Sequence, residues 1–468
     1  MSSTTEPASE RASQFSLDVD ERGIGDAFRG YIGKLRTGEP GALPSVLGLV
    51  VLVIIFSQVS DQFLSFNNIG NIPAQGAYIA VIALGLVFIL LLGEIDLSAG
   101  TTGGMAAGFA ARAIFSGNLH DALPGLVYWI LVLGMVGAIA LAVWLKAYSS
   151  AVLVAIGVVL IITNLVQHEF WATVAAIAIG GAVGVLTGFL VGKVGIPSFV
   201  VTLALFLAWQ GVLLFALNSQ PINTTNIGFW YGMTSKNLSP AWSWVFTLVV
   251  VLGYLAYTVI ASIRAKAAGL THQALSLVLL RGGVIAVVGV VLTILANRNR
   301  APNQYVVIHG IPWAAVICIA LMIACSIALS KTTWGRHLYA TGGNAEAARR
   351  AGIDVVHIKV TAFTLCSAFG AFGGVLLASQ SQAVSLNLGA GNTLLFAVAA
   401  AVIGGTSLFG GRGHPRDAII GALVITIIPN GLGLKPNLGV QYQQVITGVV
   451  LLAAASVDAV SRKRAARS

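Results

Sequence analysis

Charged residues are scarce in this chain: Asp, Glu, Lys and Arg make up 9% of its 468 residues. Soluble domains carry about 25% charged residues, so the composition excludes a soluble globular protein. Cysteine is scarce too, and Cys318, Cys325 and Cys366 all lie inside apolar runs. This placement predicts small buried side chains and excludes a disulfide framework. The seven histidines are scattered without the spacing of metal ligands, so no metal site is expected.

Apolar residues fill most of the chain. They make up 57% of the sequence, and the mean hydropathy is +0.89. A helix that crosses a bilayer needs about 20 mainly apolar residues, and the apolar runs predict an all-α, polytopic transmembrane bundle of about 12–14 spans. The expected spans are 43–60, 75–93, 99–117, 125–145, 149–167, 171–192, 198–217, 242–262, 282–297, 312–330, 359–379, 394–409, 417–431 and 441–458.

Polar segments flank this transmembrane region, residues 43–460. Residues 1–42 mix acidic and basic side chains and predict a cytosolic tail with a short surface helix over 24–35, whereas 461–468 form a basic tail. The net charge of +10 indicates basic residues that set membrane orientation, not nucleic-acid binding. Several of them lie in the loop 331–359. Placing them inside, with an even number of spans, puts both termini in the cytoplasm.

Glu94 and Asp96 interrupt the apolar sequence after a long hydrophobic run. A charge at membrane depth costs roughly 2.5–3.5 kcal/mol on insertion scales, so such residues usually face a cavity or a partner. Gly93 and Ser98 beside them indicate a helix that breaks or turns. One carboxylate can cap backbone amides while the other forms a buried pair. The alternative is that both mark a short polar loop between two helices.

The loop 331–359 contains strong signals for a short helix. Asn344 is a favourable N-cap, Glu346 follows in the first turn, and Gly352 suits the left-handed position after the last turn. The alanines between them favour helix. A helix of two turns is too short to be stable alone in water. It therefore needs a docking surface, unless it is an ordinary helix of a surface loop.

Four stretches resemble the motifs of one protein family. Residues 342–353, Gly-Gly-Asn-Ala-Glu-Ala-Ala-Arg-Arg-Ala-Gly-Ile, resemble the EAA-xxx-G loop of ABC importer permeases in its monosaccharide-permease form. Residues 93–98, 196–203 and 402–413 resemble three further motifs of the monosaccharide permeases, in the same order along the chain. The sequence is most similar to the xylose-type branch of that family, whose members are longer and carry Glu before Ile-Asp-Leu-Ser.

The resemblance implies a fold like that of type II ABC importer permeases and a membrane subunit that imports a monosaccharide, with xylose or a similar pentose or hexose expected. The implied partners are an ATP-binding subunit, an extracytoplasmic sugar-binding protein, a second permease copy in a homodimer, and the lipid bilayer of the bacterial cytoplasmic membrane. ATP and Mg²⁺ would bind to the partner subunit, and this chain would bind no cofactor and would not be an enzyme. Consistently, residues 188–194 lack the spacing of a Walker A loop.

The motifs and the polar residues in the spans give three sets of candidate residues. Coupling to the ATP-binding subunit is expected at Gly343, Asn344, Glu346, Ala347, Ala348, Arg349 and Gly352. A re-entrant turn is expected at Gly404, Gly405, Gly410, Gly411 and Arg412. The translocation path or gate is expected to include Glu94, Asp96, Ser98, Gln210, Gln380 and Asn392. The alternative function, a secondary transporter or channel for a small polar solute, predicts a chain of intramembrane carboxylates or histidines.

Overall fold

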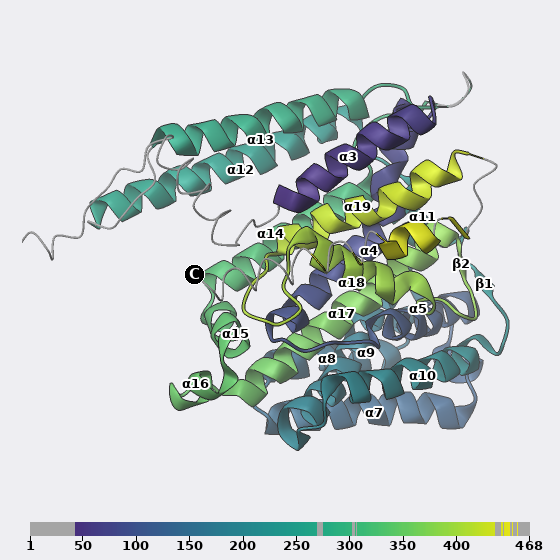
Figure 1. Ribbon diagram of the computed structural model, residues 1–468. Helices are drawn as coiled ribbons and strands as arrows, with labels where there is room; N and C mark the ends of the chain where they lie inside the picture. Colours follow the sequence, from purple (N-terminus) through teal and green to yellow (C-terminus); the bar gives the residue numbers. More distant parts are fainter. Residues whose placement is uncertain are drawn as a thin grey trace, which may run out of the picture.

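The protein is a bundle of long helices with almost no sheet (Figure 1). A computed structural model describes residues 43–268, 275–301, 305, 307–435 and parts of 441–456. Within these ranges, nine helices are long and apolar enough to cross a membrane. They are α4 (Phe66–Leu91), α7 (Gly125–Trp144), α9 (Glu169–Phe189) with its π-helical extension η2 (Leu190–Val194), α10 (Ser198–Leu217), α12 (Pro240–Ala267), α13 (Leu275–Ala296), α14 (Trp313–Lys331), α17 (Val355–Ser381) and α19 (Pro415–Gly433).

Shorter elements complete the bundle. The apolar helices are α3 (Leu43–Val59), α5 (Ala99–Ser116), α8 (Tyr148–Ile162) and α18 (Asn392–Gly404). The small connecting elements are α6 (Leu119–Ala122), η1 (Leu165–Gln167), α11 (Gly228–Ser235), α15 (Thr333–Gly343) and α16 (Ala345–Arg350). Strands β1 (Ile222–Asn223) and β2 (Ala383–Val384) pair antiparallel, with Ile222 opposite Val384. Because α15 and α16 lie at one end of the bundle and the strands at the other (Figure 1), these ends are called the α16 end and the strand end below.

Helix α17 is the centre of the core, and α4, α5 and α9 pack around it. Glycines allow the close approach that holds helices together in a bilayer. A Cβ at Gly374 would lie 2.1 Å from the backbone oxygen of Gly103, and one at Gly184 would lie 2.3 Å from that of Phe363. Two further glycines of α17 allow equally close contacts, because a Cβ at Gly370 would lie 2.5 Å from the Ala99 oxygen and one at Gly373 would lie 2.3 Å from the Ile82 side chain.

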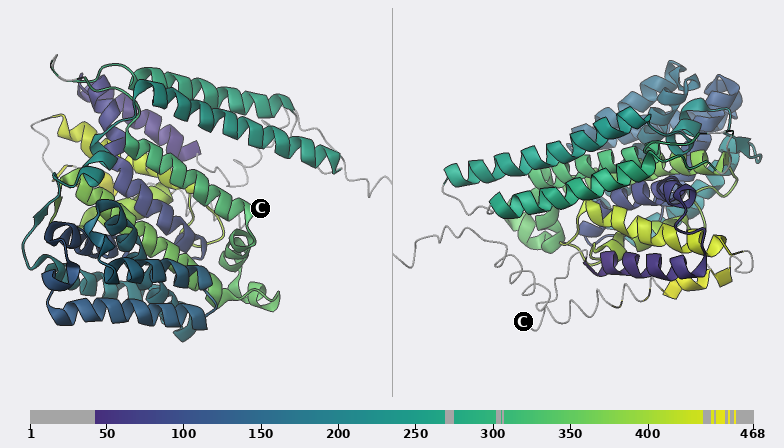
Figure 2. Two further views of the ribbon diagram at one scale, coloured as in Figure 1. Left: turned by 180° about the vertical axis from the view of Figure 1, so that it is seen from behind. Right: turned by 90° about the horizontal axis from the view of Figure 1, so that it is seen from above.

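Three sets of helices lie outside this core. Helices α7, α8 and α10 cover one side of the bundle, and α3 packs against α19 on the opposite side (Figure 1). Helices α12 and α13 form a hairpin that stands apart from the body in all views (Figure 2). Only 11% and 22% of their most apolar windows are buried. The lipid-exposed faces of this hairpin are therefore extensive.

The expected spans agree with the helices in position, but several of their bounds differ, as the examples of α4, α8 and α18 show. Every expected span from 43–60 to 417–431 contains a helix, whereas most of 441–458 lies outside the described residues. Helix α4 begins earlier than predicted because the Ser65 side chain caps a polar first turn. Helix α8 ends at Ile162, before a left-handed turn at Asn164 with a φ of 56°. Helix α18 ends at Gly404, five residues before the predicted end.

Some predictions concern residues that the structure does not describe. The cytosolic tail 1–42, its expected surface helix over 24–35 and the basic tail 461–468 all lie outside the described ranges. The cytoplasmic position of both termini therefore stays a prediction. Residues 333–343 were predicted to be loop, and the structure corrects this prediction, because these eleven residues form helix α15. The Thr332 side chain caps its first turn by accepting a hydrogen bond from the backbone N–H of Gly335.

Candidate functional site

The four motif-like stretches, far apart in the sequence, come together toward the α16 end of the bundle. They are residues 93–98, 196–203 at the start of α10, 342–353 and 402–413. The first lies in the segment 92–98 that joins α4 to α5, called the connector, and most of the last lies in the segment 405–414 between α18 and α19, called the glycine turn. The connector contacts each of the other three elements or their immediate neighbours, as the following contacts show. The sequence motifs therefore describe one structural site.

An ion pair joins the connector to the central helix. The Lys359 Nζ of α17 lies 2.6 Å from the Glu94 Oε1, and the two side chains are 21% and 18% exposed. Because both groups are largely removed from water, salt screens the pair only weakly, and removal of one partner leaves the other charge partly buried. The pair attaches the connector to the first turns of α17, shortly after α16.

Asp96 has a different role in the same segment. Its Oδ1 accepts hydrogen bonds from the backbone N–H of Ser98 at 2.8 Å and from the Ser98 hydroxyl at 2.7 Å, just before α5 begins. A negative charge is favourable at a helix N-terminus. Its Oδ2 is buried and has no hydrogen-bond partner in the described structure. One carboxylate thus caps backbone amides while the other forms an ion pair, one of the two arrangements that the sequence left open.

The connector is also fixed to α10 through its backbone. The N–H of Ile95 donates to the Ser198 Oγ at 3.2 Å, and the Thr202 hydroxyl lies 3.4 Å from the Ile95 carbonyl oxygen. Ser198 and Thr202 belong to the second of the four motif-like stretches. Their hydrogen bonds satisfy the connector's polar backbone, which lacks helical partners of its own.

Helix α5 begins inside the bundle. Its first residue, Ala99, lies against Gly370, just past the midpoint of α17, where an added Cβ would stand 2.5 Å from the Ala99 oxygen. The connector therefore rises along α17 from Lys359 to Gly370 before α5 starts. A helix that begins within the bundle presents unpaired backbone N–H groups to the interior, and such discontinuous helices form the solute sites of many transporters.

A second non-helical segment meets α5 at the same depth. Residues 385–391, between β2 and α18, enter the bundle from the strand end. A Cβ at Gly104 would lie 1.9 Å from the Leu388 oxygen, and one at Gly100 would lie 2.4 Å from the Gly389 oxygen. Glycine is required in these first two turns of α5 because the loop's backbone occupies the space of a side chain. Residues 385–391 therefore lie directly against the first two turns of α5, the helix that the connector leads into.

The glycine turn is attached to both α4 and α15. The N–H of Gly411 donates to the Leu91 oxygen at 2.8 Å, and the Tyr339 hydroxyl donates to the Gly413 oxygen at 2.6 Å. Burial raises the pKa of Tyr339, and the carboxylate of Asp417 raises it further, so the phenol remains a proton donor. Gly405, Gly410, Gly411 and Gly413 all have φ between 74° and 154°, which favours glycine at each position. The backbone thus turns between α18 and α19, whereas the re-entrant character expected for Gly404, Gly405, Gly410, Gly411 and Arg412 stays a prediction.

Gly342, at the end of α15, lies against the ends of α4 and the glycine turn. A Cβ added there would lie 1.7 Å from the Leu91 oxygen and 3.1 Å from the Gly411 nitrogen. Backbone atoms form both contacts, so the neighbours cannot yield by a change of rotamer. The neighbouring Gly343 is exposed and would have no atom within 4 Å of its Cβ. Gly342 therefore sets how closely α15 approaches the connector.

Helix α16 has the two ends that the sequence predicted. The Asn344 Oδ1 accepts from the N–H of Ala347 at 2.9 Å, which caps the N-terminus. At the other end the N–H of Gly352 donates to the Arg349 oxygen and that of Ile353 to the Ala348 oxygen, each at 3.0 Å. These two bonds define a Schellman motif, and the Gly352 φ of 85° explains the need for glycine.

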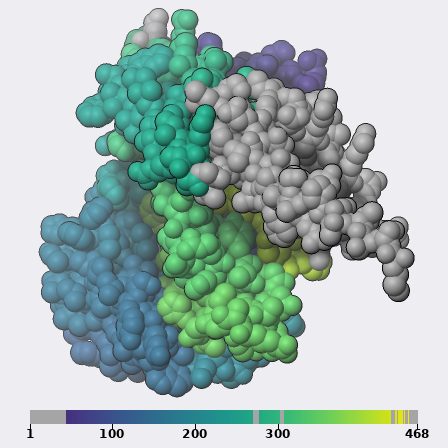
Figure 3. All heavy atoms as spheres, turned by 90° about the vertical axis from the view of Figure 1, so that its left-hand side faces the viewer, coloured from purple at the N-terminus to yellow at the C-terminus, as the bar shows by residue number. Residues whose placement is uncertain are grey.

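The outer face of α16 is exposed. Gly343, Asn344, Glu346, Ala347 and Arg349 are exposed, whereas Ala348 is buried against the body. Figure 3 shows the light-green segment with α15 and α16 at the surface of this end. Glu346 pairs with Arg349 and Arg350 at 2.7 and 3.3 Å. Exposed pairs of this kind contribute only about 0.3–0.5 kcal/mol each, so they leave these charges available to a partner.

Comparison with known proteins identifies the family. A family model described as the permease component of branched-chain amino acid transport systems matches residues 147–455. The chain belongs to this permease family. It is 29% identical to the xylose transport system permease protein XylH of Haemophilus influenzae, over 92% of this chain and 99% of the relative. The identity is 27% to Escherichia coli XylH, over 90% and 92%, and 26% to the E. coli ribose import permease RbsC, over 88% and 92%. No solved structure matches.

These relatives confirm the resemblance to sugar permeases of ABC transporters, which four short motifs indicated. They also extend it, because the similarity covers about nine tenths of the permease and not only its motifs. The multi-pass helical architecture agrees with a permease of the cytoplasmic membrane. The roles of individual residues stay predictions.

The polar candidates of the translocation path do not form one cluster in this permease. Gln210 is half-buried on α10, Gln380 is exposed near the end of α17, and Asn392 is the exposed first residue of α18. No hydrogen bond of the described structure joins the side chain of any of the three to Asp96. Asn392 is nevertheless close to the second interruption, since Leu394 on the same helix lies against Gly100.

Sequence reasoning missed several residues of the site. Lys359 was treated as a topology signal although it pairs with Glu94. Tyr339 was part of the loop 331–359 and Gly342 of the motif 342–353, both without a stated contact. Leu388 and Gly389 gave no signal alone. The spacing of Gly100 and Gly104 is the small-xxx-small pattern of close packing, and it could have indicated that another backbone lies against this face of α5.

Proposed function

We propose that this permease is the membrane-spanning subunit of an ATP-driven importer of a monosaccharide. The observation that carries the proposal is the position of α16. Its outer face is exposed, whereas its attachment through α15 reaches both the glycine turn and the connector that leads to Asp96. A force on this exposed helix would therefore reach the two interruptions inside the bundle through backbone contacts.

In this mechanism α15 and α16 move as a unit when the ATP-binding subunit changes conformation. The unit bears on the connector at Leu91 and on the turn at Gly411, and α17 follows because it begins directly after α16. Packed helices that shift as rigid bodies are a common switching device. The shift would change the contact of α5 with residues 385–391, and this contact is the proposed gate for the sugar.

The proposed partners are those that the resemblance to ABC sugar permeases implies. ATP and Mg²⁺ would bind on a separate subunit docked on α16, through Gly343, Asn344, Glu346, Ala347 and Arg349. A sugar-binding protein would deliver substrate at the strand end. A second copy of the permease would complete the pathway as a homodimer in the bacterial cytoplasmic membrane.

The proposed substrate is xylose or a similar pentose or hexose. The relatives XylH and RbsC are named for xylose and ribose transport, which supports a monosaccharide of this size. The chemistry of the interior agrees, since a neutral sugar needs hydrogen-bonding groups rather than charges. Backbone N–H groups at the start of α5 and the half-buried amide of Gln210 would supply them.

A secondary transporter or channel would need titratable groups along the pathway. In the described bundle Glu94 is neutralised by Lys359, and Asp417 accepts from the backbone N–H of His414 at 2.7 Å at the start of α19. Only the partly unsatisfied Asp96 remains as a candidate for ion coupling. The geometry therefore favours a transporter that is driven through α16 over one that is driven by an ion gradient.

The test compares two reversals of charge in the complete importer. Glu346→Lys should abolish sugar-stimulated ATP hydrolysis or co-purification of the ATP-binding subunit, because it reverses charge in the first turn of α16 and at the proposed contact. Asp61→Lys changes an exposed carboxylate in the segment between α3 and α4, toward the other end, and should have little effect. If Glu346→Lys retains both the subunit and the stimulated turnover, α16 is not the coupling element.

Substrate choice needs a separate measurement. Uptake of radiolabelled xylose, ribose and galactose in a strain that lacks the permease gene, with and without the gene restored, identifies the sugar. Restored uptake of xylose or another pentose supports the proposal. ATP-dependent uptake of branched-chain amino acids without any sugar uptake would retain the family and overturn the proposed substrate.

A further inference from the structure

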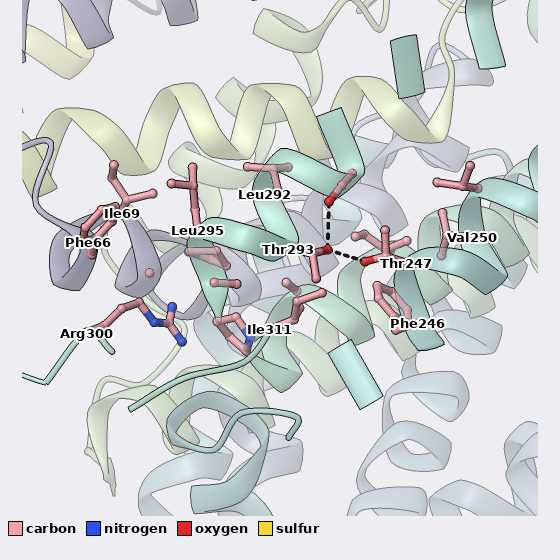
Figure 4. Close-up of a pocket in the computed structure, with 18 of the residues that line it drawn as sticks. Phe66, Ile69, Phe246, Thr247, Val250, Leu292, Thr293, Leu295, Arg300 and Ile311 are labelled. Atoms are coloured by element: carbon pink, nitrogen blue, oxygen red, sulfur yellow. Dashed lines mark hydrogen bonds between the residues drawn. The ribbon is translucent and has the colours of Figure 1, made fainter. Parts of the chain in front are cut away.

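An apolar cavity separates the peripheral hairpin from the body of the permease. Its volume is about 220 Å³, and it is partly open to the surroundings. Residues of α12 and α13 line one side and residues of α4 and α14 the other; they include Phe66, Ile69, Val250, Leu292, Ala315 and Ile319 (Figure 4). The lining is nearly all apolar, and the Thr247 and Thr293 hydroxyls within it hydrogen-bond to each other. Such a space does not favour water.

A cation stands at one end of this cavity. Figure 4 shows Arg300 beside Phe66 and Ile69, with Val250 at the opposite end. Arg300 is 6% exposed, and its Nη2 donates to the Gly310 oxygen at 2.7 Å. Its Nε is buried without a hydrogen-bond partner, and none of the ion pairs of the described chain involves this residue. Burial lowers its pKa, but a guanidinium remains protonated in proteins.

Gly70 of α4 leaves room for the guanidinium of Arg300. A Cβ at Gly70 would lie 2.0 Å from the Arg300 Nη1, so the side chain lies flat on the helix where glycine leaves room. A buried, charged and incompletely paired group is costly unless an anion compensates it. The fork of Arg donors matches the oxygens of a phosphate.

We propose that this cavity binds a phospholipid with an anionic headgroup, with the phosphate at Arg300 and an acyl chain between the hairpin and the body. The apolar lining selects a hydrocarbon chain, and the cation at one end selects a negative headgroup. The source is the bilayer itself, because α12 and α13 expose large apolar residues such as Leu248, Val249 and Val287 on their other faces. The lipid would thus join a loosely packed hairpin to α4, the helix that ends at the connector.

The test measures retained lipid. The full-length permease is extracted in mild detergent from membranes that contain phosphatidylglycerol and phosphatidylethanolamine, and native mass spectrometry records bound lipid. Wild-type protein should retain phosphatidylglycerol in preference to phosphatidylethanolamine. Arg300→Gln should weaken this retention about tenfold, as expected for the loss of one charged hydrogen-bonded contact.

Three further variants separate the headgroup contact from the tail contact. Arg298→Gln removes an exposed cation two residues away and should leave retention unchanged. Gly70→Ala should displace the guanidinium without changing charge, because only the far end of a flexible side chain must move, and it should lower the preference for phosphatidylglycerol. Ala315→Phe should fill the cavity and lower retention of both lipids. Gly70→Ala and Ala315→Phe also provide the test if Arg300→Gln fails to accumulate.

The opposite results overturn the inference. They are equal retention of both lipids by wild-type protein, or loss of the preference in Arg298→Gln but not in Arg300→Gln. Inorganic phosphate that binds equally well to Ala315→Phe would show a free-anion site instead of a lipid site. A change from dimer to monomer on filling the cavity, with no lipid retained by wild-type protein, would show that a second copy of the chain occupies it.

Discussion

The substitution Gly342→Ala tests whether α15 transmits motion by direct backbone contact. The new Cβ would lie 1.7 Å from the Leu91 oxygen and 3.1 Å from the Gly411 nitrogen, between two atoms that now form a 2.8 Å hydrogen bond. Overpacking of this kind typically costs about 1–3 kcal/mol, and loss of the hydrogen bond adds about 1 kcal/mol. We expect α15 to move away from the connector and the total cost to be about 2–4 kcal/mol.

The neighbouring Gly343→Ala is the matched control. Its Cβ would meet no atom within 4 Å, so it should change stability by less than about 0.5 kcal/mol. The assay is thermal unfolding of each purified variant together with sugar-stimulated ATP hydrolysis of the assembled importer. Gly342→Ala should lower the Tm and uncouple hydrolysis from the loaded binding protein, while Gly343→Ala should do neither. Equal behaviour of the two variants would refute the backbone contact as the path of coupling.

Three further substitutions address the connector and α16. Glu94→Gln should destabilise the permease by up to about 3 kcal/mol in a thermal unfolding assay, because it leaves Lys359 partly buried without a partner. Adding Lys359→Met to this variant should recover part of the lost stability. A double variant whose loss of stability equals the sum of the two single losses would contradict a stabilising ion pair. Asp96→Asn should lower sugar uptake more than Asp61→Asn, since only Asp96 caps α5 inside the bundle; unchanged uptake would favour a plain polar loop. Gly352→Val should impair coupling strongly and Gly352→Asn should impair it much less, because asparagine tolerates positive φ and valine does not. Equal sugar-stimulated ATPase rates of the two variants would contradict this.

Local features of the fold were predictable from the sequence because their causes are local. The ends of α16 follow from an N-cap at Asn344 and a left-handed glycine at Gly352, and both positions have the predicted geometry. The spans follow from hydropathy. Helix α15 was missed because Trp334, His337 and Tyr339 give it a mixed, aromatic composition without the length of a span.

The long-range contacts of the site could not be predicted in this way. Glu94 and Lys359 are 265 positions apart, and nothing near either residue indicates the other. The entry of residues 385–391 into the bundle depends on glycines of α5 almost three hundred positions earlier. The sequence showed that the connector was irregular, but only the packing shows that residues 385–391 lie against the start of α5.

The central claim is that the exposed face of α16 contacts the ATP-binding subunit, and cysteine cross-linking tests it most directly. The native cysteines among the described residues, Cys318, Cys325 and Cys366, are buried, so a new exposed cysteine can be targeted selectively. Ala347→Cys lies on the exposed face of α16, and Asn226→Cys lies on the exposed surface just after β1 at the strand end. Short bifunctional thiol reagents should link Ala347→Cys, and not Asn226→Cys, to the ATP-binding subunit in assembled membranes, with a yield that changes when ATP is added. Cross-linking at Asn226 but not at Ala347 would contradict the account.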